Sequence, residues 1–257
     1  MKIGAQFYTL REFCKTHEGL DESLKRVADM GYSSVQLSGV CDYDAGWMKE
    51  RLDAYGLTAD LTHFSYRRIL DDTAATVDFH KRMGCRYIGL GSIPDFSKNG
   101  CRCEDFDAFV EEVRPALDTI AASGCRFLYH NHNFEFAKED GLTYLERLTR
   151  VFTPEQLGFT IDTYWVQAGG ADPIYWIKKL RDRVPCIHFK DMVYHPGDRA
   201  VRMAPVGEGN MNIEGIIVAC EQAGVEVGFV ELDHCYGRDP FECMKVSYDY
   251  LKSLGLE

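Results

Sequence analysis

Long apolar runs and an export signal are both missing from this sequence of 257 residues. No stretch approaches the roughly 18 uninterrupted apolar residues that cross a membrane. Near the amino terminus, the polar side chains of Gln6, Thr9 and Arg11 come before the apolar core of a secretory signal can form. Ten cysteines are present but none forms a CxxC pair, so neither a cysteine zinc site nor a disulfide framework is indicated. We therefore expect a cytoplasmic protein with reduced thiols and no membrane partner.

Basic residues are also fewer than acidic ones in this sequence. The chain has 29 lysines and arginines against 40 aspartates and glutamates, which gives a formal charge of −11. Such a field repels phosphate backbones, so we expect no nucleic-acid partner. The glycine-rich phosphate loops GxGxxG and GxxxxGK(S/T) do not occur either, which disfavours a doubly wound nucleotide-binding sheet.

The sequence does contain a regular alternation of short apolar runs with longer amphipathic segments, which is typical of βαβ units. The eight runs that we predict to be strands are Ile3–Phe7, Ser34–Leu37, Thr58–His63, Tyr87–Leu90, Phe127–His130, Gly158–Asp162, Cys186–Lys190 and Val227–Leu232. Predicted helices lie between and after them, near 20–30, 45–55, 71–83, 104–123, 141–150, 173–182, 212–223 and 240–253.

A recurring turn joins several predicted helices to the next strand. Glycine stands just past the helix at Gly31, Gly84, Gly124 and Gly224, one or two residues before an apolar run. No linker rich in proline, glycine or serine divides the chain, and 46% of its residues are hydrophobic. We therefore predict the α/β class and a single (β/α)₈ TIM barrel domain over residues 1–257.

Polar and charged side chains collect where the predicted strands end. In a TIM barrel these carboxyl ends meet at one face, which carries the active site. The runs in question are Gln6-Phe7-Tyr8, Gln36, His63, Tyr129-His130-Asn131-His132-Asn133-Phe134-Glu135, Asp162-Thr163-Tyr164-Trp165, His188-Phe189-Lys190-Asp191 and Glu231-Leu232-Asp233-His234. Ionisable groups are costly in a barrel mouth unless they bind a metal, pair or contact a polar ligand.

Three of these groups form a candidate metal site. Asp162, His188 and Glu231 end three successive predicted strands. Carboxylates and imidazole without thiolate suit a divalent ion such as Mn²⁺, Mg²⁺, Co²⁺ or Zn²⁺. A lone histidine on a strand is more often a core residue, but two neighbouring carboxylates favour the metal interpretation for His188.

Other strand-end residues are candidates for contact with a substrate. His130 and His132 share a direction if the strand is still extended there, and Lys190 shares that of His188. Trp165 is either a wall for the apolar face of a sugar or a core residue at a helix start.

These residues, taken together, resemble a known family. The pattern comprises Gly4-Ala5-Gln6-Phe7-Tyr8, Tyr129-His130-Asn131-His132 with Glu135-Phe136, Asp162-Thr163-Tyr164-Trp165, His188-Phe189-Lys190-Asp191, Gly207-Glu208-Gly209 and Glu231-Leu232-Asp233. In this order it is similar to the sugar phosphate isomerase/epimerase group of xylose isomerase-like TIM barrels. That superfamily also includes ketose 3-epimerases, hydroxypyruvate isomerase, inosose dehydratase, 3-dehydroshikimate dehydratase and endonuclease IV.

The resemblance implies four ligands for one divalent metal ion. Three fall on Asp162, His188 and Glu231, whereas ketose 3-epimerases carry the remaining glutamate where this chain has Tyr129 or His130. Glu135 is the nearest carboxylate and our preferred fourth ligand, with His130 or His132 as alternatives. Among the strand-end residues, we expect substrate contacts from Gln6, His63, His130 and Trp165.

We expect an enzyme that abstracts a proton next to the carbonyl of an unphosphorylated keto-sugar or related polyol, through an enediolate. Glu231 or Glu135 is the expected base, and His132 or Lys190 the opposing acid. Isomerisation or epimerisation is the first expectation, dehydration or another lyase reaction on a keto-sugar or keto-cyclitol the second, and a non-catalytic sugar-binding barrel the third. Because dimers and tetramers are common in the family, a homo-oligomer is a further option.

Overall fold

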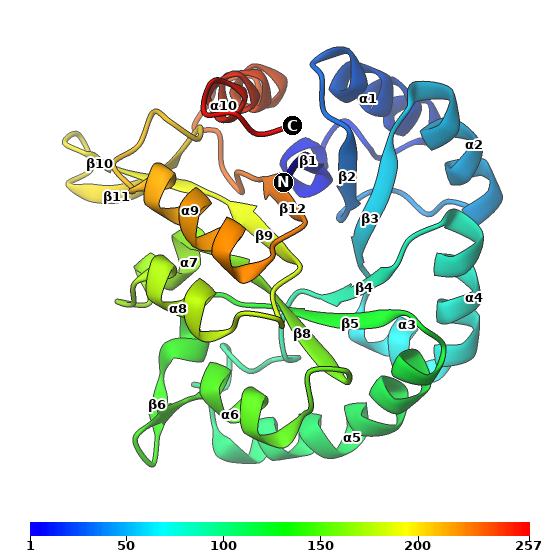
Figure 1. Cartoon of the computed structure of the whole chain (residues 1–257), viewed down its shortest axis with the longest axis vertical. Coiled ribbons are helices and arrows are strands. Elements are labelled where there is room, and N and C mark those ends of the chain that lie inside the picture. Colours follow the sequence, from blue (N-terminus) through cyan, green and yellow to red (C-terminus); the bar gives the residue numbers. More distant parts are fainter.

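The computed structural model describes all 257 residues, and its centre is a closed barrel of eight parallel strands (Figure 1). Around the barrel the strands are β1 (Lys2–Gln6), β2 (Ser34–Leu37), β3 (Thr58–His63), β4 (Tyr87–Leu90), β5 (Arg126–His130), β8 (Leu157–Asp162), β9 (Cys186–Phe189) and β12 (Val227–Val230). The barrel closes because β12 pairs with β1, with Lys2 opposite Val227 and Ala5 opposite Val230. The predicted TIM barrel and its eight strands are confirmed.

Helices cover the outside of the barrel (Figure 1). They are α1 (His17–Asp29), α2 (Ala45–Tyr55), α3 (Tyr66–Asp71), α4 (Thr73–Met83), α5 (Cys103–Ala122), α6 (Tyr144–Val151), α7 (Thr163–Ala168), α8 (Pro173–Lys179), α9 (Ile213–Ala223) and α10 (Pro240–Ser253). The predicted glycine turns occur at Gly84 and Gly224, which end α4 and α9 with φ of 79° and 77°. Glycine suits these positions because side chains strain a left-handed backbone.

Apolar side chains fill the interior of the barrel. A small cluster of Leu61, Tyr87, Leu128, Cys186, Val227 and Phe229 lies inside it, and a much larger cluster packs the strands against the helices. Gly228 lets the ring of Phe189 lie directly against β12, because a Cβ at this position would overlap that ring. With its interior filled, the barrel leaves its carboxyl-terminal mouth for polar groups.

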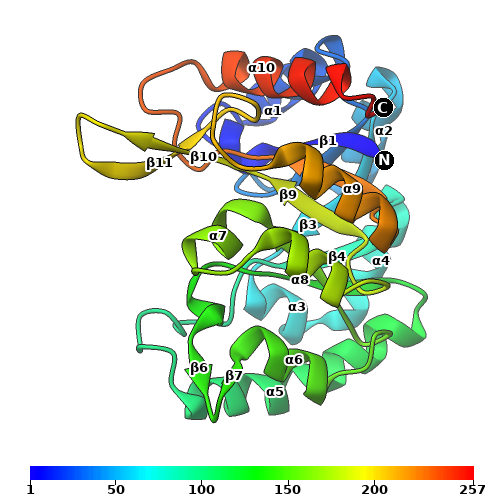
Figure 2. The same ribbon diagram turned by 60° about the vertical axis from the view of Figure 1, so that its left-hand side comes forward.

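Two short antiparallel hairpins depart from the simple alternation of strand and helix. One consists of β6 (Lys138–Glu139) and β7 (Leu142–Thr143), and the other of β10 (Asp191–His195) and β11 (Ala200–Ala204). Figure 2 shows β10–β11 projecting from the barrel after β9. The sequence predicts no strand between 191 and 204, because isolated two-stranded ribbons carry little apolar patterning.

A single buried carboxylate fixes the base of the β10–β11 hairpin. Asp191 accepts hydrogen bonds from the backbone N–H groups of Met192 (2.7 Å), Gly207 (3.0 Å), Gly209 (3.0 Å) and Met211 (3.1 Å). Since Asp191 follows Lys190 directly, this network also fixes the chain beyond β9.

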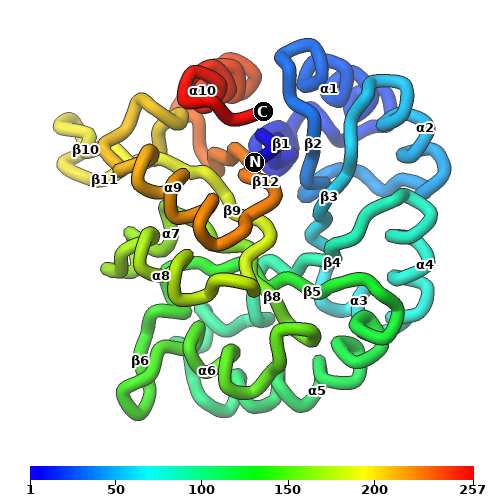
Figure 3. Tube along the Cα trace, in the orientation of Figure 1, coloured from blue at the N-terminus to red at the C-terminus, as the bar shows by residue number.

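The two ends of the chain lie side by side, as the trace in Figure 3 shows. The backbone N–H of Ile3 donates to the carbonyl of Glu257 at 2.5 Å, and that of Glu257 donates to the carbonyl of Met1 at 3.2 Å. None of the helices is both long enough and apolar enough to span a membrane.

Candidate functional site

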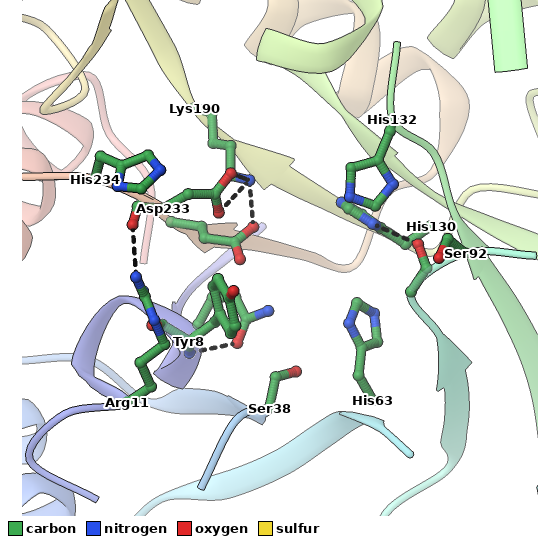
Figure 4. Close-up of a pocket in the computed structure, with 13 residues that line it drawn as sticks. Tyr8, Arg11, Ser38, His63, Ser92, His130, His132, Lys190, Asp233 and His234 are labelled. Carbon is green, nitrogen blue, oxygen red and sulfur yellow. Dashed lines mark hydrogen bonds and ion pairs between the residues drawn. The ribbon is translucent and has the colours of Figure 1, made fainter. Parts of the chain in front are cut away.

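A polar cavity of about 350 Å³ opens at the carboxyl ends of the barrel strands (Figure 4). Its walls are Gln6, Tyr8, Arg11, Ser38, His63, Gly91, Ser92, His130, His132, Lys190, Glu231, Asp233 and His234. Hydroxyl, imidazole, carboxylate and cationic groups make up most of this surface. The structure thus brings six predicted residues into one cavity, namely Gln6, His63, His130, His132, Lys190 and Glu231.

Four buried side chains at the base of the cavity form a candidate metal site. His130 is the last residue of β5, Asp162 the last of β8, His188 the third of β9, and Glu231 follows β12 directly. One ligand atom from each lies within 4.8 Å of the others. This cluster of two imidazoles and two carboxylates could hold a divalent ion.

Hydrogen bonding around His188 supports this interpretation. Its Nε2 lies 2.7 Å from Oε1 of Gln36 on β2, which can only accept, so Nε2 carries the proton and Nδ1 is left towards the carboxylates. Nδ1 lies 2.8 Å from Glu231 Oε2. Both atoms are buried, but neither has a hydrogen-bond partner, because the bond angles between them do not suit a hydrogen bond. Two ligand atoms close together and without hydrogen-bond partners fit a shared metal ion.

The charges within the cluster are strongly coupled. Burial alone would lower the pKa of His188, but the carboxylates of Glu231 and Asp162 outweigh it and raise that pKa. Burial alone would raise the pKa of Asp162 and of Glu231, yet the Lys190 ammonium, followed by the neighbouring histidines, lowers both well below their usual range. Both carboxylates therefore remain ionised at neutral pH and available to a cation.

Lys190 is the main source of that stabilisation. Its Nζ lies 3.1 Å from Asp162 Oδ2, 2.9 Å from Glu231 Oε2 and 2.9 Å from Asp233 Oδ1. Burial would lower the pKa of Lys190, but these three carboxylates raise it well above its usual range. Lys190 is therefore a cation at neutral pH, and its expected role as the acid stays a prediction.

His63 and His132, which lie across the cavity from Lys190 (Figure 4), are neutral. Burial, followed by the neighbouring His130, lowers the pKa of His63 well below its usual range and that of His132 to about 3. His63 Nε2 and His132 Nδ1 are both buried without a hydrogen-bond partner. Neutral imidazoles with a free ring nitrogen can accept a hydrogen bond from a ligand hydroxyl.

Glu135, our preferred fourth metal ligand, lies outside the cluster of candidate ligands. It belongs to the short 3₁₀ turn Phe134–Phe136, where its carboxylate accepts from the Tyr129 hydroxyl (2.5 Å) and the His132 backbone N–H (2.8 Å). This turn folds the carboxylate back onto β5, outside the cluster, and it lines no part of the cavity. His130 supplies the fourth group instead. Burial raises the pKa of Glu135 to about 7, against the lowering effect of its hydrogen bonds.

The remaining predicted residues support the site to different degrees. Gln6 lines the cavity, and its Oε1 accepts from the backbone N–H of Tyr8 at 3.0 Å. Trp165 stands behind the cavity wall, with its ring centroid 5.5 Å from that of His132. Its backbone N–H donates to Asp162 Oδ1 at 2.9 Å, so that Asp162 also caps α7.

Seven cavity residues received no role from the sequence: Tyr8, Arg11, Ser38, Gly91, Ser92, Asp233 and His234. Arg11 donates to the backbone carbonyls of Tyr8 (2.7 Å) and Asp233 (3.0 Å). For Asp233 a signal existed, since it stands two residues beyond Glu231. Arg11 offered none, because the loop that holds its partner Asp233 lies 222 residues away in the chain.

Comparison with known families gives the context of this site. A sequence model of the family described as "Xylose isomerase-like TIM barrel" matches residues 24–253. The chain belongs to this family. The resemblance inferred from the strand-end motifs is thereby confirmed.

Individual members of the family are only distantly similar to this chain. An inosose dehydratase of Geobacillus kaustophilus is 24% identical over 200 residues, which are 68% of this chain and 63% of that protein, so the match spans less than two thirds of the relative. The solved structure of a sugar phosphate isomerase/epimerase from Parabacteroides distasonis is 26% identical, with a TM-score of 0.78 and 98% of each chain covered. The structure of an IOLI protein with a bound zinc atom has a TM-score of 0.72 at 14% identity, over 99% of this chain and 98% of that one.

Proposed function

We propose that this protein is a metal-dependent isomerase or epimerase of a neutral keto-sugar or related polyol. The observation that carries the proposal is the buried His130–Asp162–His188–Glu231 cluster at the base of a polar cavity. The family to which the chain belongs, and the sugar phosphate isomerase/epimerase structure that it resembles, support this reaction class.

The lining of the cavity supports a substrate without phosphate. Arg11 turns its terminal N–H groups to two backbone carbonyls and stacks on the Tyr8 ring, 4.3 Å from its centroid. Lys190 is fully paired with carboxylates, and His63 and His132 are neutral. The cations here already direct N–H groups to carbonyls or carboxylates instead of a phosphate dianion, whereas sugar hydroxyls would find many donors and acceptors.

Groups that can exchange protons stand on two sides of the cavity. Lys190 and Asp233 lie on one wall, and His63 and His132 on the other (Figure 4). Glu231 belongs to the Lys190 wall through their 2.9 Å ion pair. A divalent ion held by the cluster would polarise the substrate carbonyl and its neighbouring hydroxyl. Glu231 takes the proton from the adjacent carbon, and a neutral imidazole opposite can relay a proton by accepting one at one ring nitrogen while it donates from the other.

Dehydration is the second candidate, and a specific observation favours it. Two strand-borne glutamates face each other in ketose 3-epimerases, but His130 stands in place of one of them here, and Glu135 lies outside the cluster. The inosose dehydratase of Geobacillus kaustophilus is also among the similar proteins. Loss of a hydroxyl next to the carbanion needs a base, which Glu231 can provide, and a group that assists the leaving hydroxyl, to which the neutral His132 can donate a hydrogen bond.

Incubation with unphosphorylated keto-sugars and keto-cyclitols in D₂O, with added Mn²⁺ or Co²⁺, tests the proposal. We expect solvent deuterium at the carbon next to the carbonyl, detected by NMR. An epimer or aldose as product supports the first candidate, and an unsaturated ketone the second. Absence of exchange with every substrate class would contradict both.

The variant Glu231→Gln tests whether Glu231 is the catalytic base. It removes the base while keeping the shape of the side chain, so turnover should fall by about 1,000-fold or more. Circular dichroism and the melting temperature should show an intact fold. A Glu231→Gln enzyme with near-normal activity would exclude Glu231 as the base.

A further inference from the structure

Lys190 is held by three carboxylates, but it forms directed hydrogen bonds with only one of them. Nζ donates to both carboxylate oxygens of Asp233, at 2.9 Å and 3.1 Å. Its approaches to Asp162 and Glu231 are ion pairs without hydrogen-bond geometry. Asp233 is therefore the residue that orients the ammonium, while Asp162 and Glu231 share it with the candidate metal site.

The ammonium has no route away from the cluster. Lys190 is 1% exposed. Its backbone N–H donates to the Thr163 hydroxyl at 3.0 Å, and that hydroxyl donates to the Lys190 carbonyl at 2.8 Å. The ring of Trp165 stands 5.7 Å from Nζ. Since its backbone is fixed and its side chain is enclosed, any cation that enters must coexist with Lys190.

Counting formal charges shows why this coexistence depends on Asp233. The three carboxylates of Asp162, Glu231 and Asp233 carry −3 and the Lys190 ammonium +1, which leaves −2 when the histidines are neutral. A divalent cation brings the net formal charge of this group to zero. Without Asp233 the same group would carry +1 after metal entry, and two cations would repel each other across the shared carboxylates.

We propose that Lys190 is a resident counter-cation of the metal site and that Asp233, by neutralising it, sets the affinity of the site for a divalent ion. This inference rests on the metal site of the proposed function. Asp233 is a positioning residue, which acts on the metal through Lys190. In the metal-free protein, the same ammonium keeps two buried carboxylates from repelling each other.

Calorimetric titration of the metal-stripped protein with Mn²⁺ tests the proposal without any substrate. The four proteins compared are wild type, Asp233→Asn, Lys190→Met and the double variant. We expect Asp233→Asn to raise the Kd for Mn²⁺ by about tenfold or more, as one uncompensated charge a few ångströms away would. Lys190→Met should lower the Kd, because it removes the competing cation. In the double variant the effect of Asp233→Asn should largely disappear, which a merely structural role of Asp233 would not produce.

Lys245→Met is the matched control. Lys245 forms an ion pair with Asp249 on the exposed side of α10, so this variant loses an equivalent ion pair away from the site and its Kd for Mn²⁺ should not change. If Lys190→Met does not fold, Lys190→Gln takes its place with the same expectation. Melting temperatures of the metal-free proteins provide a second readout, which should fall for Lys190→Met because Asp162 and Glu231 lose their counter-ion.

The outcomes separate this inference from the proposed function. If wild type binds Mn²⁺ and Asp233→Asn binds it equally well, or if the effects of the two substitutions simply add, the inference is overturned and the metal site stands. If wild type binds neither Mn²⁺ nor Co²⁺ nor Zn²⁺, the metal site of the proposed function fails, and this inference fails with it.

Discussion

Individual side chains in this barrel mouth differ in protonation because their surroundings differ. Asp162 and Glu231 stay ionised beside Lys190, whereas Glu135, equally buried, faces only hydrogen-bond donors, and its pKa rises to about 7. His132 is neutral because burial dominates, while carboxylates outweigh burial at His188. Charge partners, more than burial itself, therefore decide which groups can serve as base or ligand.

The raised pKa of Glu135 makes a prediction about stability. Between the unfolded pKa, near 4.5, and the folded value of about 7, the folded state keeps a proton that the unfolded state has lost. The contribution of Glu135 to the free energy of unfolding should therefore fall as pH rises through this window, by about 3 kcal/mol in total. Because His63, His132 and His188 add their own pH dependence, this contribution is measured as the difference between wild type and Glu135→Gln in urea unfolding at pH 5 and pH 8. Glu139→Gln, at an exposed carboxylate on β6, should show the same pH dependence as wild type; a Glu135→Gln protein that also does so would contradict the assignment.

Single elements place the site through a few structural details. β12 ends one residue before Glu231, β8 ends on Asp162, and Asp162 also caps α7, so the strand ends aim both carboxylates at the mouth. Close packing between β9 and β12 depends on Gly228, and the path of the chain after β9 depends on Asp191.

Gly228→Ala should destabilise the barrel. The added methyl group would overlap the ring of Phe189, and a well-packed core resists such overpacking by about 1–3 kcal/mol. Chemical denaturation of the variant should show this loss. The control is Gly91→Ala, where the nearest side-chain atom is 3.7 Å from the added carbon and little change is expected. Equal stability of both variants would refute the packing argument.

Asp191→Asn should loosen the β10–β11 hairpin and the loop after it. The amide keeps one acceptor oxygen but turns a donor towards backbone N–H groups, so at least two hydrogen bonds are lost and stability should fall by about 3 kcal/mol. Hydrogen exchange should become faster at 203–211. Asp198→Asn, at an exposed position in the same hairpin, should change stability by less than about 1 kcal/mol. Unchanged exchange in Asp191→Asn would show that the hairpin is held by other contacts.

The whole molecule combines an acidic surface with a filled barrel and a polar mouth. Its formal charge is −11, and three of its carboxylates, Asp162, Glu231 and Asp233, line or underlie the cavity beside one ammonium. This arrangement links metal binding to the stability of the entire fold, since the ligands come from β5, β8, β9 and the end of β12.

A divalent ion should therefore raise the melting temperature of the metal-stripped protein. An ion present at about 100 times its Kd stabilises the folded state by about 2.7 kcal/mol. This gain in stability should shrink as pH falls, because a metal ion must displace the proton from His188 before it can bind there. Glu231 and Asp162 raise the pKa of His188, so this competition between proton and metal ion extends to higher pH. Melting curves with and without Mn²⁺ at pH 6 and pH 8 provide the measurement. An equal shift at both pH values would exclude His188 as a ligand.

The sequence by itself determined the eight βα units, the barrel and the strand ends that carry Asp162, His188 and Glu231, because periodicity and strand termini are local properties of the chain. Only the tertiary structure decided between Glu135 and His130, since the 3₁₀ turn after β5 and a hydrogen bond from Tyr129 draw the carboxylate away. It also decided the partners of Lys190, which three carboxylates from two strand ends surround only once β9 pairs with β8 on one side and with β12 on the other. Distances between strand ends follow from the pairing of strands far apart in the chain, and no local pattern encodes them.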